Sequence, residues 1–193
     1  MVEFDSANTV VLSMDFQNDI VTRLVPVESA VIERAAGVLA CTRAAGIPVV
    51  HVAVQFRPGH PEVPDRGVFA RIRQMGAFVS GTPGAAIHDR VAPLEGEVVC
   101  IKKRVGAFSG SDLDVVLRAL GRTHLVLLGI ATSGVVLSTI RAAADLDYTM
   151  HVISDCCADA DPEVHRVLME KVFPRMATPV TAEAFAAALS SRS

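Results

Sequence analysis

Three places in this sequence carry groups suited to acid–base or charge-stabilising chemistry. Asp15, Lys102 and the turn 129–134 each follow an apolar, β-branched run. A carboxyl group at the end of a buried strand is partly desolvated, which raises its pKa and suits it to general acid or base catalysis. An ammonium group can neutralise that acid or hold an anion, and backbone N–H groups in a turn can hold negative charge. Plainer interpretations remain open, namely a turn aspartate, a solvated basic turn (preferred for Lys103) and an ordinary helix cap.

The elements that would position these groups alternate along the chain. Ser-Asp-Leu-Asp at 111–114 fits a capping box, Gly121 ends that helix, and Asp161 with Pro162 begins a later one. Strands are predicted at 9–14, 48–54, 98–101, 125–130, 150–154 and 177–180, with helices at 27–45, 111–120, from Thr132 or Ser133 to 146, 161–172 and 181–189.

Strand–helix alternation predicts a three-layer α/β/α fold with a doubly wound, mostly parallel six-stranded sheet of Rossmann-like type. The length of 193 residues and the absence of a linker indicate one domain, 1–193. In such sheets ligands bind beyond the carboxyl ends of the strands. The segments expected to share that edge are 15–19, 55–57, 102–108, 131–135 and 155–159.

Composition excludes several classes of function. Lys and Arg number 18 against 21 Asp and Glu, so neither nucleic acid nor an anionic membrane is an expected partner. No run reaches the roughly 20 apolar residues of a membrane span, and the acidic start at 1–5 does not fit a signal peptide. The four cysteines fit buried thiols in a reducing cytoplasm, and the adjacent Cys156 and Cys157 should point in opposite directions.

Several motifs in register resemble the isochorismatase-like hydrolases, the superfamily that includes nicotinamidases and N-carbamoylsarcosine amidases. Residues 15–19 (Asp-Phe-Gln-Asn-Asp) look like the first motif of that superfamily. The other matches are 102–114, 129–139, 81–85 and 155–159, followed by Pro162, Glu163 and His165. The resemblance covers nearly the whole chain.

The resemblance implies a catalytic set of Asp, Lys and Cys. Asp15 and Lys102 match the first two, and the nucleophilic Cys falls at Val135. Because valine has no nucleophilic atom, the acyl-enzyme route is closed at that position. The superfamily also places a non-proline cis peptide in its third motif, which maps to Ile130–Ala131.

Other routes to a nucleophile or a metal are not expected. Ser133 comes too early in the turn, Thr132 matches a structural residue of the superfamily, and the two adjacent cysteines follow the fifth strand. Nicotinamidases carry metal-binding Asp and His after the second strand, where this chain has Gln55-Phe56-Arg57-Pro58. We therefore expect no metal and no cofactor. Arg57 could clamp a substrate carboxylate or lie on the surface, and the nearby His60 is expected to be solvated.

The sequence thus predicts a cytoplasmic hydrolase that acts without a Cys nucleophile on small molecules, anionic ones among them. Asp15 is the general acid/base and Lys102 the charge stabiliser. True isochorismatases also lack the Cys and protonate a vinyl ether instead. The alternative is a catalytically silent relative that binds a small ligand or acts as a subunit.

Remaining expectations concern contacts and assembly. The resemblance implies a homodimer or homotetramer. A nucleotide-binding Rossmann domain is disfavoured because no Gly-x-Gly-x-x-Gly follows the first strand. Substrate contacts are expected from Phe16, Gln17, Phe56, Arg57, Phe108, Ala131, Thr132 and Ser133.

Overall fold

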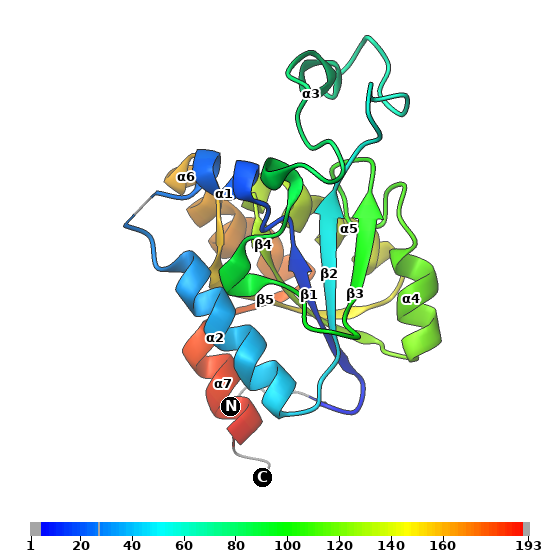
Figure 1. Cartoon of the computed structure of the whole chain (residues 1–193). Helices are drawn as coiled ribbons and strands as arrows, with labels where there is room; N and C mark the ends of the chain where they lie inside the picture. Colours follow the sequence, from blue (N-terminus) through cyan, green and yellow to red (C-terminus); the bar gives the residue numbers. More distant parts are fainter. Residues whose placement is uncertain (1–4, 27, 191–193) are drawn as a thin grey trace.

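A six-stranded parallel sheet forms the centre of the computed structural model, which describes residues 5–26 and 28–190 (Figure 1). The strand order is β3-β2-β1-β4-β5-β6, and each neighbouring pair runs parallel, which confirms the predicted α/β class. The strands are β1 (Thr9–Met14), β2 (Val49–Val54), β3 (Val98–Lys102), β4 (His124–Ile130), β5 (Thr149–Ala158) and β6 (Thr178–Val180).

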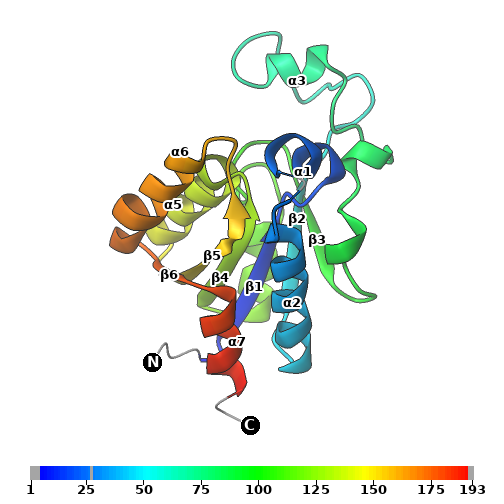
Figure 2. The same ribbon diagram turned by 90° about the vertical axis from the view of Figure 1, so that its left-hand side faces the viewer.

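Helices cover both faces of this sheet, giving the predicted three layers (Figure 2). Along β1 the side chains alternate between the faces, as a strand requires: Val10, Leu12 and Met14 pack in one apolar cluster and Val11 in the other. One layer holds α1 (Asn18–Leu24), α2 (Val31–Ala44) and α7 (Ala182–Ser190), and the other holds α4 (Leu113–Leu120), α5 (Leu137–Asp145) and α6 (Pro162–Val167).

Most predicted element boundaries differ from the structure by a residue or more, and two of the differences matter here. The helix predicted at 27–45 begins at Val31, and position 27 lies outside the described residues. The strand predicted at 150–154 continues to Ala158, so most of 155–159 belongs to the sheet. Cys156 and Cys157 therefore lie within β5, where they enter opposite apolar clusters, as expected of adjacent strand residues. No helix in the described part of the chain is long and apolar enough to cross a bilayer.

Two predicted helix ends are correct, namely the start of α6 and the end of α4. The Asp161 carboxylate accepts a hydrogen bond from the Glu163 N–H at the start of α6, and Gly121 ends α4 in the left-handed conformation (φ 61°). The capping box at 111–114 does not form. Ser111 instead donates to the Ala107 carbonyl and accepts a 3.3 Å bond from the Leu113 N–H.

Residues 57–80 leave the body of the molecule as an arm, with α3 (Ala70–Gln74) in it, above the carboxyl edge of the sheet (Figure 1). The base of the arm is closed on itself. The Phe56 N–H donates to the Phe78 carbonyl and the Ser80 N–H donates to the Phe56 carbonyl, both at 2.9 Å. A separate apolar cluster, including Val63 and Phe78, fills that base. The arm therefore stands directly over the edge where ligands bind in this fold.

Candidate active site

The strand order has its switch point between β1 and β4, since the chain proceeds to one side from β1 and to the other from β4. Ligands in open α/β sheets bind in the crevice at this point. Gly129 pairs with Met14 there, and a Cβ added at Gly129 would lie 2.6 Å from the Met14 carbonyl oxygen. Glycine therefore permits the close approach of the two strands that frame the site.

Asp15 directly follows β1 in a left-handed backbone conformation, with φ at 58°. This region is uncommon for residues with a side chain, and Asp and Asn adopt it more readily than most. Its N–H donates to the Val52 carbonyl at 2.8 Å, which fixes the turn against β2. The Asp15 side chain is only 7% exposed, so its carboxyl group is held inside the protein.

Lys102 reaches Asp15 from the end of β3, two strands away. Its Nζ lies 2.8 Å from Asp15 Oδ2, and it also donates to the carbonyls of Arg104 at 3.0 Å and Val105 at 2.8 Å. An ammonium group has three N–H donors, and these three acceptors occupy them all. The structure thus brings together the acid and the cation that the sequence placed at one edge, with the cation committed to the acid.

Burial raises the pKa of Asp15 above its usual range, and Lys102 opposes that shift without cancelling it. Asp15 Oδ1 is buried and has no hydrogen-bond partner within the described residues, whereas Oδ2 faces the ammonium. A carboxyl group with one oxygen still available and a raised pKa can donate a proton to a ligand or accept one from it.

A cavity of about 180 Å³ opens onto this pair. Drug-sized ligands occupy roughly 300–1,000 Å³, so this cavity suits a small molecule. Its remaining wall is largely apolar and comes from α1, the arm and the β4–α5 turn. The apolar lining side chains are Ile20, Leu24, Val54, Val68, Phe69, Ile72, Phe78, Val105, Ile130, Ala131 and Val135.

The β4–α5 turn begins with a cis peptide bond between Ile130 and Ala131, as the resemblance implied. A π-helical turn, Thr132–Val136, follows it. The sequence predicted that Thr132 or Ser133 would cap the next helix, but α5 begins only at Leu137 and neither residue caps it. The Thr132 hydroxyl lies 2.8 Å from His165 Nδ1, and the Ser133 N–H donates to the Asp159 carboxylate at 2.7 Å. The Thr132 hydroxyl and the Ser133 N–H, which were expected to contact substrate, therefore hydrogen-bond to residues that follow β5.

The backbone N–H groups of this turn are partly committed to the turn itself. Those of Gly134 and Val136 both donate to the Ala131 carbonyl, and that of Ser133 already has its carboxylate. Of the three turn residues predicted to contact substrate, only Ala131 lines the cavity. Three of the N–H groups that were expected to hold developing negative charge are therefore already hydrogen-bonded within the protein.

Val135 is buried and its hydrocarbon side chain forms part of the cavity wall. The thiols lie elsewhere: Cys156 and Cys157 are buried in the two core clusters and do not line the cavity. Burial raises the pKa of Cys157 to about 12 and raises that of Cys156 as well, so both stay protonated near neutral pH.

The three phenylalanines expected to wall the site do not line it. Phe16 packs in the core beneath α2, and Phe56 is buried at the base of the arm. Phe108 faces Tyr148 on the other layer, with ring centroids 6.3 Å apart. Phe69 and Phe78 supply the aromatic wall instead. Sequence reasoning missed them because the arm lacks the periodicity that would show which side chains face inward.

Gln17 and Arg57 also have roles other than the predicted substrate contacts. The Gln17 amide donates to the carbonyls of Val54 at 2.9 Å and Ala85 at 2.7 Å and accepts from the Val54 N–H at 2.8 Å, so it joins three segments. Arg57 is 74% exposed and pairs with Glu62 at 3.2 Å. Arg57 therefore takes the second of its two predicted roles, that of a surface arginine, and does not line the cavity.

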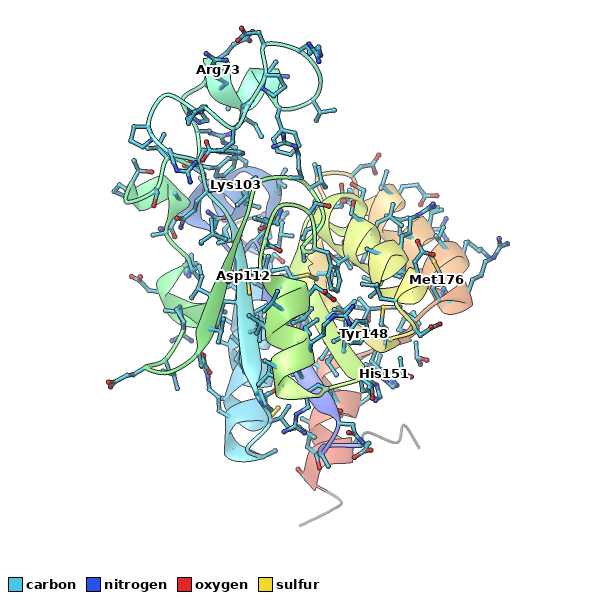
Figure 3. All side chains as sticks on the ribbon, turned by 90° about the vertical axis from the view of Figure 1, so that its right-hand side faces the viewer. Arg73, Lys103, Asp112, Tyr148, His151 and Met176 are labelled. Carbon is cyan, nitrogen blue, oxygen red and sulfur yellow. The ribbon has the colours of Figure 1, made fainter. Side chains whose placement is uncertain are left out.

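Side chains around the arm's base differ from their expected solvated state. His60 is buried, and its Nε2 donates to the Ala77 carbonyl at 2.7 Å. Lys103 lies where the arm joins the body (Figure 3) and donates to the Gln55 carbonyl at 2.6 Å. Across residues 5–26 and 28–190, no group of three or more His, Cys, Asp or Glu side chains is arranged to hold a metal ion.

Comparison with known proteins identifies the class to which this site belongs. An isochorismatase-domain family model matches residues 9–184. The chain is 34% identical over 159 residues to maleamate amidohydrolase from Pseudomonas putida, covering 80% of this chain and 74% of that protein. It is 32% identical over 183 residues to ureidoacrylate amidohydrolase from Methylorubrum extorquens, covering 83% of this chain and 74% of that one.

A solved structure shows the same architecture. An isochorismatase family protein from Burkholderia thailandensis superposes with a TM-score of 0.83 at 28% identity, covering 97% of this chain and 98% of that one. The chain therefore belongs to the isochorismatase family of hydrolases, as its motifs predicted.

Proposed function

We propose that this chain hydrolyses a small molecule without a thiol nucleophile, using Asp15 as general acid and base. One observation carries the proposal: a buried Asp15–Lys102 pair, 2.8 Å between Nζ and Oδ2, opens onto a small cavity. Burial raises the pKa of Asp15, which makes it a better partner for proton donation than a solvent-exposed aspartate. Val135 provides no atom for a covalent intermediate, so water attacks the substrate directly.

In this mechanism the proton on Asp15 activates the substrate and Lys102 stabilises the carboxylate that remains. With an enol ether, Asp15 protonates the terminal vinyl carbon and leaves an oxocarbenium carbon. Water adds there, and Asp15 takes up one proton from it, which gives a hemiketal. The carbon–oxygen bond to the leaving group then breaks as the hemiketal hydroxyl proton passes to the departing oxygen, so a ketone and an alcohol form. One water is consumed and Asp15 returns protonated. With an amide, the carboxylate form instead removes a proton from the attacking water, and the acid so formed gives that proton to the departing nitrogen as the carbon–nitrogen bond breaks.

Two sets of substrates are therefore worth testing. Enol ethers of the isochorismate type suit direct protonation by Asp15. Amides and ureas are suggested by the relatives named for maleamate and ureidoacrylate. The cavity volume of about 180 Å³ restricts both sets to small members.

The test is turnover on both sets by the native chain and by Asp15→Asn. Asparagine keeps the size of the side chain and tolerates the left-handed backbone at position 15, so the fold should persist. We expect a loss of about 10²–10⁴-fold, the usual contribution of a general acid or base. Full activity in Asp15→Asn would reject the assignment.

Val135 favours one alternative, a catalytically silent relative that binds a small ligand. Its side chain puts hydrocarbon on the cavity wall at the position that matches the family's Cys. This alternative gains if enol ethers, amides and ureas are all stable while a small carboxylate raises the melting temperature. New amidase activity in Val135→Cys would show that the rest of the catalytic site is intact.

A further inference from the structure

Arg104 lies at the mouth of the cavity, two residues beyond the strand-ending Lys102. Its guanidinium carbon lies 5.4 Å from the ring centroid of Phe69 on the arm. One terminal nitrogen donates to the Lys103 carbonyl at 2.6 Å and the other to the Glu62 carbonyl at 3.2 Å. These contacts tie the guanidinium to both the arm and the body, so its plane is oriented before any ligand arrives.

The charge of Arg104 is not neutralised inside the protein. Both of its hydrogen-bond acceptors are carbonyl oxygens, and within the described ranges no carboxylate lies at ion-pair distance from it. The other cation that lines the cavity, Lys102, is paired with Asp15. A guanidinium has five N–H donors, so at least three remain after those two bonds, enough for a two-pronged bond to a carboxylate.

Cationic side chains on the arm add to the positive electrostatic potential around the cavity mouth. The arm carries Arg57, Arg66, Arg71 and Arg73 against two acids, although the whole chain has a net charge of −3. Figure 3 shows Arg73 on the arm and Lys103 at its base, on the same side of the molecule. A local excess of cations raises the concentration of anions at the entrance of a cleft.

We infer that the ligand of this site carries a carboxylate that Arg104 binds at the cavity mouth while the reacting group reaches Asp15. What happens at Asp15 rests on the proposed function; anion binding at Arg104 does not. The substrate class is thus a small acid whose carbon skeleton packs between Phe69 and Val105 and whose scissile group lies farther in. Arg104 takes the role that the sequence had suggested for Arg57.

The test measures binding by calorimetry with matched probes that cannot be hydrolysed: benzoate against acetophenone and butyrate against 2-pentanone. Each ketone replaces one carboxylate oxygen with a methyl group, so only the charge and its hydrogen bonds change. We expect each acid to bind at least about tenfold more tightly than its ketone at low salt, and to weaken as ionic strength rises.

Variants assign the preference to a residue. Arg104→Gln should weaken acid binding about tenfold or more and leave ketone binding unchanged, and Arg104→Lys should fall between because it keeps the charge without the fork. Arg57→Gln is the matched control and should alter neither by more than about twofold, since Arg57 is exposed and paired.

Three results would overturn the inference: ketones that bind as well as the acids, an acid preference that survives in Arg104→Gln, or no binding of either acid. Because no turnover is involved, failure of this inference and failure of the proposed function are separable. Acid binding without hydrolysis leaves the inference standing, and hydrolysis confined to neutral substrates removes the inference alone.

Discussion

Replacing Lys102 with methionine removes the partner of a buried carboxylate. Lys102 and Asp15 have side chains only 2% and 7% exposed, so solvent cannot replace the lost ammonium. Removing one partner of a buried pair costs about 3–5 kcal/mol, because the remaining charge is left uncompensated. Since 1 kcal/mol shifts the melting temperature of a chain this size by roughly 2–4 °C, we expect a drop of about 6–20 °C near neutral pH.

The loss should depend on pH with a definite sign. Lys102 lowers the pKa of Asp15, so its removal raises that already elevated pKa further. A carboxyl group whose pKa is higher in the folded state than in the unfolded chain, about 3.9, stabilises the fold at low pH and loses that contribution as pH rises through the folded-state pKa. The deficit of Lys102→Met should therefore be small near pH 4 and largest near pH 8.

Urea unfolding of wild type and variant across that pH range is the assay. Lys103→Met is the matched control; its side chain is 26% exposed, and we expect a loss of about 1 kcal/mol with no comparable change between pH 4 and pH 8. Adding Asp15→Asn to Lys102→Met should recover part of the stability, because the uncompensated charge is then gone. An equal deficit at pH 4 and pH 8, or no recovery in the double variant, would refute the reasoning.

Two further predictions concern the framework of the site. Gly129→Ala places a Cβ 2.6 Å from the Met14 carbonyl oxygen and should destabilise the fold by about 1–3 kcal/mol, which an unchanged melting temperature would contradict. Burial of Glu97 would raise its pKa, but hydrogen bonds from Arg43 and His51 outweigh that effect and lower the pKa to about 2. Ionised Glu97 therefore stabilises the fold above pH 4.5, and this contribution is lost as pH falls toward 2. Glu97→Gln should lose about 1.5–3 kcal/mol at pH 7 and converge with wild type in acid; parallel acid-unfolding curves would disprove this.

The sheet and its reactive pair could be predicted because both follow from strand ends. Apolar runs that stop at Asp15 and Lys102 mark where two parallel strands finish, and such ends share one edge of the sheet. The extension of β5 to Ala158 was not predictable, because Asp155 interrupts the apolar run that defined the strand. Its carboxylate instead accepts a hydrogen bond from the Ala182 N–H at the start of α7, a contact that depends on tertiary structure.

The cavity wall could not be predicted because side-chain direction there depends on irregular backbone. Phe16 follows a left-handed residue, so the alternation that holds along β1 does not carry past Asp15, and Phe16 enters the core. Phe69 and Phe78 lie on the arm, which has no sequence period. Arg57 and Arg104 are equally basic in sequence, and only the folded arm shows which of them faces the cavity.

The closed base of the arm separates recognition from chemistry. Phe56 pins both ends of residues 57–80 together through two 2.9 Å hydrogen bonds, so the sheet does not depend on what the loop between them contains. A transplanted arm of another length or sequence would replace the apolar wall from Val68 to Phe78 and leave Asp15 and Lys102 where they are. Sequence changes within residues 57–80 can therefore alter which molecules enter the cavity without displacing the Asp15–Lys102 pair.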